Sequence, residues 1–386
     1  MAAGRRPLAA RLRLSALLLL ALLCGAEPQE GGLCQSLDAE GKKEALLSVA
    51  NPFFGPAAAV RPAAGGRRDM AVLMTLYSPG RFVRPVLNAL AVKNRMEAAG
   101  IPLYIVEVAV GGEPHVFRPA DTHLLLRSDS CLFQKERLLN ALEKKVPRRF
   151  TKLLFLDADV GLASAQPGGP HWYDVLSRLL DDHEVVHPFD VCGYLDLSMR
   201  RVDEVKCSVL RAARGRPLDP QLSTLHPGFG WAYNREWLNL HGGLFDLAIH
   251  GGGDSLNGAA VGQFDVCWPE GATPPKGYKR CKLTFNGLLV RAYADEFGKY
   301  ALAVKADPPR VAVAPLLAVH YWHGRKQKRQ ISSRFDHFEN VSRIMDVLES
   351  NADGIWELRT KESELARHLN ATLCRYFRHR SDDDIT

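Results

Sequence analysis

The sequence predicts a mixed α/β fold in which helices flank a mainly parallel sheet. Between residues 70 and 156, apolar runs of strand length alternate with longer segments of helical periodicity. This alternation is typical of β-α-β units, whose consecutive strands pair in parallel. Hydrophobic residues make up 46% and charged residues 24% of the 386-residue chain, so a largely disordered or polytopic membrane protein is not expected.

Each element of this alternation has recognisable boundaries. Gly100 and Pro102 end the first helix, and Leu138, Leu139 and Leu142 form the apolar face of the second. The apolar runs are bounded by turn-forming residues. In chain order, the expected strands are 70–76, 103–110, 123–126 and 152–156, and the expected helices are 82–99 and 135–145.

Residues 1–26 have the pattern of a secretory leader. Basic residues precede the apolar run Leu14–Leu23, which is too short to span a bilayer comfortably. A cleaved signal peptide and an uncleaved signal-anchor both remain open, the latter with membrane association through residues 12–26. Both predict the lumen of the secretory pathway, in the Golgi or the ER, where the sequons at Asn340 and Asn370 would be glycosylation sites.

The charge of the chain is only weakly basic outside this leader. The net charge of +7 falls to +3 without residues 1–26, because four basic residues and no acidic residue lie there. Nucleic acid is therefore not expected as a partner.

The cysteines fit an oxidising compartment. Seven remain beyond the leader, so one is free or pairs elsewhere. Cys192/Cys207 and Cys267/Cys281 are the locally plausible pairs, because each closes a short loop. No two cysteines have Cys-x-x-Cys spacing, so a cysteine-bound zinc ion is not expected.

The strongest chemical signal is an Asp-x-Asp pair directly after an apolar strand. Asp157 and Asp159 follow the run 152–156, and ligands of open α/β sheets bind beyond the carboxyl ends of strands. Two such carboxylates repel each other unless a cation or hydrogen bonds offset their charge. The functional interpretation is a divalent metal that holds a substrate diphosphate, and the alternative is a solvated acidic turn.

A second signal follows the apolar run 311–319. His320 and His323 are spaced so that both imidazoles can face one ion. The basic run from Arg325 to Arg329 could neutralise phosphate charge. Imidazole together with carboxylate favours Mn²⁺ over a site designed purely for Mg²⁺. The alternative is a histidine pair with structural partners beside an exposed basic loop.

Two segments rich in glycine and aromatic residues, 228–237 and 241–254, form the third signal. Glycine lets the backbone approach a ligand closely, and tryptophans such as Trp231 offer flat apolar faces to sugar rings. Asp254 follows three glycines and could act as a general base toward an acceptor hydroxyl. The alternative is a glycine-rich hairpin with packing tryptophans. The segment lacks the Lys-Ser/Thr of a P-loop.

The fourth signal is the segment Phe133–Asn140, which opens the helix before the acidic strand. Lys135 could reach a nucleotide or a phosphate, and Asn140 could brace the site. Ordinary exposed or capping roles are the alternative for both residues.

Taken together and in this order, the four segments resemble nucleotide-sugar-dependent glycosyltransferases of the GT-A fold, most nearly the β-1,4-galactosyltransferases. The family's Phe-Asn-Arg-x-x-Leu-Leu-Asn helix resembles Phe133–Asn140, and its Asp-x-Asp matches Asp157-Ala-Asp159. Its Gly-Gly-Glu-Asp segment is similar to Gly251–Asp254, and its Met-x-x-His-Ser-Arg segment is similar to His320–Arg325. Its early Pro-x-Arg loop is similar to Pro79–Arg81.

The family's Trp-Gly-Trp-Gly-Gly loop is absent from this chain, further positions depart from the family pattern, and one further segment is similar to it. Gly253 replaces the family's Glu before the base, and His320 replaces its Met. The family's Gln-Arg-Phe-Asp is similar to Ser333–Asp336.

The resemblance implies a GT-A-like, Rossmann-related catalytic domain at 70–345, between a stem at 27–69 and a helical extension and tail at 346–386. Toward the C-terminus, residues 335–378 are expected to be helical and residues 381–386 to be frayed. The implied reaction moves a hexose from a UDP-sugar to a hydroxyl of a glycan, glycoprotein or glycolipid. Inversion at the sugar and Mn²⁺ or Mg²⁺ as the cofactor are part of this expectation.

The resemblance also implies roles for individual residues. Asp254 is the expected catalytic base, and Lys135 and Arg325 are the leading basic residues for the diphosphate. The expected metal ligands are Asp157, Asp159, His320 and His323, and the expected donor-binding residues are Arg81, Phe133, Lys135, Asn140, Asp157, Trp231, Gly252, Gly253 and Arg325. A catalytically inactive sugar- or nucleotide-binding protein of the same fold and a metal-dependent phosphoesterase are the alternatives.

Overall fold

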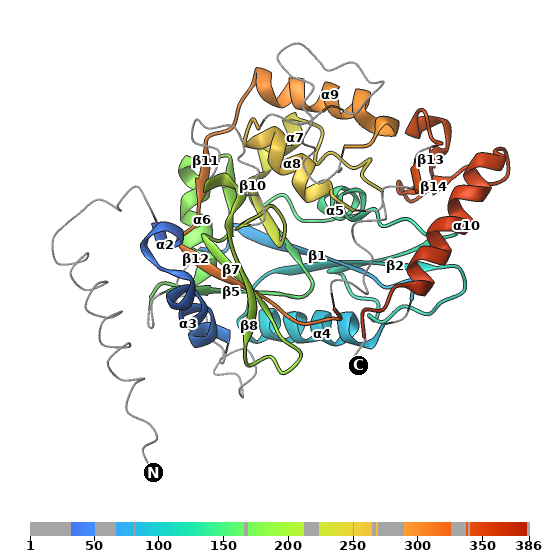
Figure 1. Cartoon of the computed structure of the whole chain (residues 1–386). Coiled ribbons are helices and arrows are strands. Elements are labelled where there is room, and N and C mark those ends of the chain that lie inside the picture. Colours follow the sequence, from blue (N-terminus) through green and yellow to red (C-terminus); the bar gives the residue numbers. More distant parts are fainter. Residues whose placement is uncertain are drawn as a thin grey trace.

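The computed structural model describes most of the chain beyond residue 31 (Figure 1). The described residues are 32–50, 67–80, 82–165, 169–211, 224–249, 251–264, 268, 289–325, 337–338 and 340–383. The expected leader, Arg81, Cys267, Cys281 and Ser333–Asp336 lie outside them. Within the described ranges, no helix is both long and apolar enough to cross a bilayer.

The largest sheet in these ranges has seven strands and is mixed. Its strands are β1 (Met70–Tyr77), β2 (Leu103–Val110), β3 (His123–Ser128), β4 (Lys152–Asp157), β6 (Val185–His187), β10 (Gly230–Asn234) and β11 (Val311–Val313). Their spatial order is β11-β6-β10-β4-β1-β2-β3. Neighbouring strands are parallel except at β10, which runs antiparallel to β4 and to β6. The predicted mixed, mainly parallel sheet is thereby confirmed.

Side chains of the central strands alternate between two cores, one on each face of the sheet. In β1, Ala71 and Leu73 belong to one core, whereas Val72 and Met74 belong to the other. The first core is completed by α5 (Lys135–Glu143), α7 (Arg235–Leu240), α8 (Gly253–Val261), α9 (Arg291–Ala306) and α10 (Glu364–His379), and the second by α4 (Val83–Ala98) and α6 (Trp172–Asp182) (Figure 1). Burial on both faces explains the continuous apolar runs of these strands. Every element expected between residues 70 and 156 is present, with boundaries that differ by at most two residues.

The sequence does not predict a second sheet, which has five strands. These strands are β5 (Val160–Ser164), β12 (Leu316–His320), β7 (Val191–Leu195), β8 (Val202–Ser208) and β9 (Leu225–His226), in that spatial order, and a short 3-10 helix η2 (Val209–Arg211) follows β8. β12 pairs antiparallel with β5, so that His320 lies opposite Val160. This pairing brings the acidic and histidine motifs together although they are far apart in the chain.

Part of the expected stem is packed against the second sheet. The helices α2 (Gly32–Ser36) and α3 (Ala39–Ala50) lie beside it, and α3 contacts β7, β8 and β12 (Figure 1). Leu46 of α3 is fully buried in the second core. A segment that lacks apolar periodicity in its later half therefore begins with a packed helical unit.

One expected disulfide is wrong. Cys207 pairs with Cys34, which anchors α2 to β8, and Cys192 is buried and keeps its thiol. In the β7–β8 ladder, Cys192 lies opposite Lys206 and not opposite Cys207. Because neighbouring residues of a strand point to opposite faces, this one-residue offset directs the two sulfur atoms away from each other.

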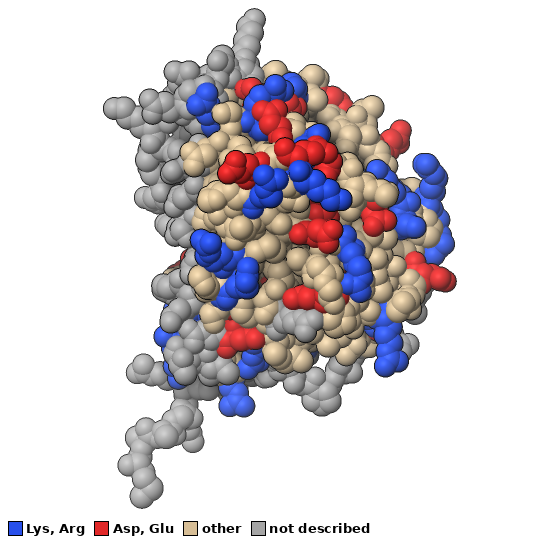
Figure 2. Space-filling model, turned by 90° about the vertical axis from the view of Figure 1, so that its right-hand side faces the viewer, with Lys and Arg blue, Asp and Glu red and all other residues tan. Residues whose placement is uncertain are grey.

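The C-terminal region is mixed, whereas the sequence predicts helix throughout 335–378. A 3-10 helix η5 (Ile344–Asp346) and a hairpin of β13 (Leu348–Ser350) and β14 (Trp356–Leu358) precede α10. The hairpin turn is set by Asn351, whose side-chain oxygen accepts the backbone N–H groups of Asp353 and Ile355. The face on which α10 lies carries basic and acidic side chains interspersed (Figure 2).

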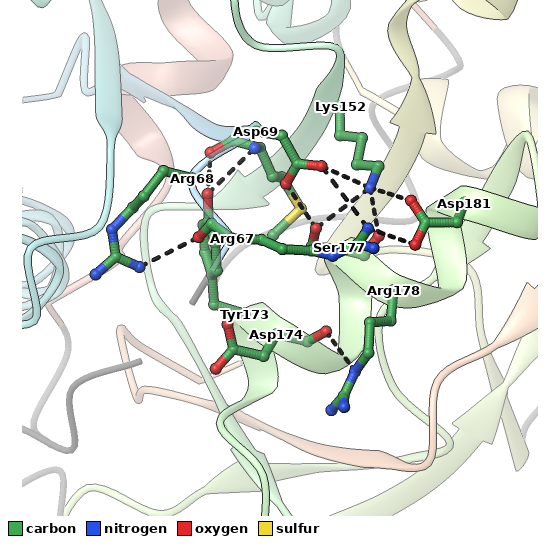
Figure 3. A network of polar contacts seen from close by, with 10 residues as sticks. Arg67, Arg68, Asp69, Lys152, Tyr173, Asp174, Ser177, Arg178 and Asp181 are labelled. Atoms are coloured by element: carbon green, nitrogen blue, oxygen red, sulfur yellow. Dashed lines mark hydrogen bonds and ion pairs between the residues drawn. The ribbon is translucent and has the colours of Figure 1, made fainter. Parts of the chain in front are cut away.

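A polar network holds the N-terminal end of β4, opposite to its acidic end (Figure 3). The buried Lys152 donates from Nζ to Asp69 (2.7 Å), to Asp181 (2.6 Å) and to the carbonyl oxygen of Ser177 (2.7 Å). Asp69 precedes β1, and Ser177 and Asp181 belong to α6. The network therefore ties α6 to the two central strands, and pairing with two carboxylates offsets the cost of burying the ammonium group.

Candidate active site

A cavity of about 330 Å³ opens at the carboxyl ends of β1 and β4. Thr75 and Tyr77 of β1 and Asp157 at the end of β4 line it. Ligands of open α/β sheets bind at this edge. The cavity therefore lies where the sequence predicts a site.

The pairing of β12 with β5 assembles a group of three potential metal ligands. His320 ends β12, and the backbone N–H of Tyr321 donates to the carbonyl oxygen of Asp159 at 2.8 Å. The Nε2 atoms of His323 and His320 lie 3.0 Å and 3.5 Å from Oδ2 of Asp159. One ligand atom from each of these three residues lies within 4.8 Å of the other two.

These three side chains fit a divalent cation. Both histidines are buried, and neither ring nitrogen of His323 makes a hydrogen bond to a described residue. A buried polar nitrogen without such a bond is costly, so a ligand is expected to satisfy it. Two imidazoles and one carboxylate suit Mn²⁺ better than Mg²⁺. Asp157, the fourth expected ligand, lies outside this group.

Asp157 is bound instead by Lys135, the first residue of α5. The Nζ atom of Lys135 donates to Oδ1 of Asp157 at 3.0 Å, forms a close ion pair with Asp254, and lies 3.9 Å from Oε1 of Glu136. Burial alone would lower the pKa of Lys135, but the three carboxylates outweigh burial and raise this pKa well above its ordinary value. Lys135 is therefore charged and holds both aspartates in the cavity.

The cavity contains more acid than base. Burial raises the pKa of Glu136, and Asp254 adds to this effect, although Lys135 acts against it. Burial likewise raises the pKa of Asp157, which Lys135 opposes and which Asp254 and Asp159 increase. Carboxyl groups that repel one another in a cleft favour the binding of an additional cation.

Glycines shape the backbone around Asp254, which lies in the first turn of α8. Gly251 and Gly252 have φ angles of 103° and 89°, which side chains on L-residues rarely allow. Gly228 packs directly against the carboxylate, since a Cβ at this position would lie 2.8 Å from Oδ2 of Asp254. Glycine at these positions is thus what lets Asp254 face Lys135 and Asp157.

Glu136 is a carboxyl group that the sequence does not predict in the site. Its side chain is buried and lines the cavity. A Cβ at Gly253 would overlap the Glu136 carboxylate. Gly253 stands where the resembled family has Glu, and here a carboxylate from α5 occupies the space beside this glycine.

The other expected donor-binding residues divide into two sets. Phe133, Lys135, Asp157 and Gly252 line the cavity, whereas Asn140, Trp231, Gly253 and Arg325 do not. The amide of Asn140 pairs with both backbone groups of Leu244 at 2.9 Å, and the buried Trp231 donates from Nε1 to the carbonyl oxygen of Pro227. Arg325 is exposed. Asn140 and Trp231 thus bond to backbone groups here, and donor binding by Asn140, Trp231 and Arg325 stays a prediction.

The C-terminal end contributes residues that the sequence does not predict in the site. Phe377, Arg380 and Asp382 line the cavity, as do Tyr194 and His226 of the second sheet. The expectation of a frayed tail is therefore wrong for residues 381–383. No spacing pattern marks these residues, and an acidic run near a chain end is typical of an exposed tail. The one available signal is the apolar face of the helix that precedes them.

No protein-family model and no curated protein sequence matches the chain. Among solved structures, a Drosophila β1,4-galactosyltransferase 7 mutant in complex with manganese, UDP-Gal and xylobiose matches with 11% identity and a TM-score of 0.28, over 54% of this chain and 68% of that one. GalNAc-T7 with UDP, GalNAc and Mn²⁺ matches with 12% identity and a TM-score of 0.34, over 77% and 55%. Glucosyl-3-phosphoglycerate synthase of M. tuberculosis matches with 14% identity and a TM-score of 0.28, over 77% and 84%. Identities and TM-scores this low carry no inference about activity.

Proposed function

We propose that the protein is a divalent-metal-dependent glycosyltransferase of the GT-A type. It moves a hexose from a UDP-sugar to a hydroxyl group of a glycan, glycoprotein or glycolipid, with inversion at the sugar. One observation carries this proposal: the ligand group Asp159, His320 and His323 opens into the same cavity as Asp254. Direct transfer requires that the metal that holds the diphosphate and the base that activates the acceptor lie in one cavity.

The proposed reaction is a direct displacement at the anomeric carbon, with Asp254 as the base. Asp254 accepts the proton of the acceptor hydroxyl while the oxygen of that hydroxyl attacks the anomeric carbon. The new carbon–oxygen bond forms as the bond to the β-phosphate oxygen breaks, and the electron pair leaves with the diphosphate. Lys135 orients Asp254 through its ion pair. When bound, Mn²⁺ or Mg²⁺ would supply positive charge for the leaving diphosphate.

The proposed location is the lumen of the secretory pathway, in the Golgi or the ER. Two disulfides, Cys34–Cys207 and Cys131–Cys374, support this location because such bonds persist in oxidising compartments. The leader-like residues 1–26 support it as well, as a signal peptide or as an anchor.

The test is release of UDP from a panel of UDP-sugars, with and without acceptor glycans. Residues 27–386, expressed under conditions that form both disulfides, retain Cys34 and α3. We expect release with Mn²⁺ or Mg²⁺, and none with EDTA or in the Asp159→Ala and His323→Ala variants. His368→Ala, an exposed histidine of α10, is the control.

Different results would favour the alternatives. UDP that binds without any release points to an inactive binding protein. Hydrolysis of phosphate esters without an acceptor points to a phosphoesterase. The Asp254→Asn variant separates the base from the donor site, because it should abolish transfer while UDP still binds.

A further inference from the structure

Helix α10, the last helix in the described part of the chain, is held beside the cavity. A disulfide joins Cys374 of α10 to Cys131, which precedes α5, and the backbone N–H of Cys131 donates to Asn370 at 3.0 Å. Further along α10, the ring of Phe377 packs edge-on against Tyr77 of β1, with centroids 5.4 Å apart. The end of α10 is therefore held beside the strand ends that form the cavity.

The residues after α10, Arg380–Asp383, form a C-terminal segment that is held at its far end as well. Both carboxylate oxygens of Asp383 accept backbone N–H groups in the first turn of α4, from Val83 (2.6 Å) and Arg84 (2.7 Å). Asp383 thus caps a helix whose own N-cap side chain makes no such bond. Gly324 leaves room for the crossing, since a Cβ there would lie 2.7 Å from the carbonyl oxygen of Ser381.

Between these two anchors, Arg380 and Asp382 line the cavity. The Nε atom of Arg380 donates to Oδ1 of Asp382 at 2.9 Å, and the two side chains are only 12% and 9% exposed. Oδ2 of Asp382 lies 4.0 Å from Nδ1 of His323, whose Nε2 faces Asp159. No hydrogen bond joins these two atoms, but the carboxylate lies beside the ring nitrogen that does not face Asp159. The C-terminal segment therefore reaches the metal ligands themselves.

The basic side chains that line the cavity indicate one residue for binding the diphosphate. Among the described lining residues, Lys135 and Arg380 are the two with a Lys or Arg side chain. Lys135 is engaged by Asp157 and Asp254. A guanidinium group has five N–H donors in a planar fork that matches phosphate oxygens, so the hydrogen bonds of Arg380 to Asp382 and to Tyr376 fix the fork without using all of its donors.

We propose that Arg380 binds the diphosphate of the nucleotide-sugar donor, and that the C-terminal segment forms part of the donor-binding site. This inference rests on the proposed function. Arg380 takes the role that the sequence assigns to Arg325. Asp382 is a positioning residue, which holds the guanidinium group of Arg380 and faces His323.

The test compares two probes, UDP and uridine, with the full chain in Mn²⁺. Calorimetry measures the affinity for UDP, and ligand-observed NMR measures the affinity for uridine, which lacks phosphate. In Arg380→Gln we expect UDP to bind roughly tenfold to a hundredfold more weakly and uridine to bind as before, the usual effect of losing hydrogen bonds to a charged group. Arg380→Lys, which keeps the charge but loses the fork, should lie between the two.

Arg378→Gln is the matched control, because Arg378 is an exposed arginine two positions earlier, in the last turn of α10. It should bind UDP like the wild type. Unchanged UDP affinity in Arg380→Gln, or an equal loss for UDP and uridine in a variant that melts like the wild type, would overturn the inference and leave the proposed function intact. A wild-type protein that does not bind UDP would overturn both. If Arg380→Gln fails to fold, Arg380→Lys decides the question by the same comparison.

Discussion

The carboxylate of Glu136 occupies the space into which a side chain at Gly253 would project. Glu136 belongs to α5 and Gly253 begins α8, so the relationship couples two segments that are distant in the chain. Only one of these two positions can direct a side chain into this space. The buried carboxylate beside Asp254 therefore comes from α5.

The first prediction concerns this shared space. Gly253→Ala should displace Glu136 and disturb Lys135, with a loss of stability of about 1–3 kcal/mol, as is usual for overpacking, and a loss of UDP release. Denaturant unfolding and the UDP-release assay measure the two effects. Gly112→Ala is the control, because a Cβ at Gly112 meets nothing within 4 Å. A Gly253→Ala variant as stable and active as the control would contradict the assignment. The double variant Glu136→Ala/Gly253→Glu should have a larger free energy of unfolding than Gly253→Glu alone.

The second prediction concerns pH. Burial raises the pKa of Glu136 from 4.5 to about 8, so the folded protein retains a proton that the unfolded chain has already lost. The contribution of this group to stability is therefore full below about pH 4.5 and is lost as the pH rises toward 8. Glu136→Gln cannot ionise. The free energy of unfolding of the wild type, relative to this variant, should fall between pH 5 and pH 8.

This difference is measured by urea unfolding in EDTA at several pH values. Glu349→Gln, which replaces an exposed glutamate of β13, serves as the control and should show no such trend. A parallel pH dependence of the wild type and Glu136→Gln would show that Glu136 is not the group responsible.

The third prediction concerns metal binding without turnover. Mn²⁺ should raise the melting temperature of the wild type, because a ligand that binds only the folded state adds about 2.7 kcal/mol at one hundred times its Kd. Asp159→Asn should abolish this increase without lowering the stability in EDTA, since the substitution removes a carboxylate that repels Asp157. His368→Ala should keep the increase. A Mn²⁺ effect that survives Asp159→Asn would place the ion elsewhere.

The fourth prediction contrasts the two disulfides. The Cys131–Cys374 disulfide holds α10 beside the cavity, whereas the Cys34–Cys207 disulfide holds α2 against the second sheet. Replacing either pair by serine should cost about 2–5 kcal/mol of stability. Only the Cys131→Ser/Cys374→Ser variant should also weaken UDP binding, measured by calorimetry below its melting temperature. Equal UDP affinity in the two double variants would argue against a role of α10 in the donor site.

The sequence by itself predicts the central part of this fold. The strands from β1 to β4 and the helices between them follow from local periodicity and from turn residues such as Gly100 and Pro102, whose effects act within a few positions. The acidic and histidine motifs are visible for the same reason, since Asp157 and Asp159 follow a strand directly and His320 and His323 are three positions apart. Their proximity is not visible locally, because it depends on the pairing of β12 with β5.

Only the tertiary structure decides which other side chains reach the cavity. Arg380 and Asp382 arrive there because a disulfide, an aromatic contact and a helix cap hold the end of the chain in place, and each of these joins residues that are distant in sequence. Arg325 is excluded although it lies two positions from His323. Glu136 faces the cavity because Gly253 leaves the space empty. Periodicity and spacing report local preferences, whereas contacts between distant segments depend on packing and exclusion in three dimensions.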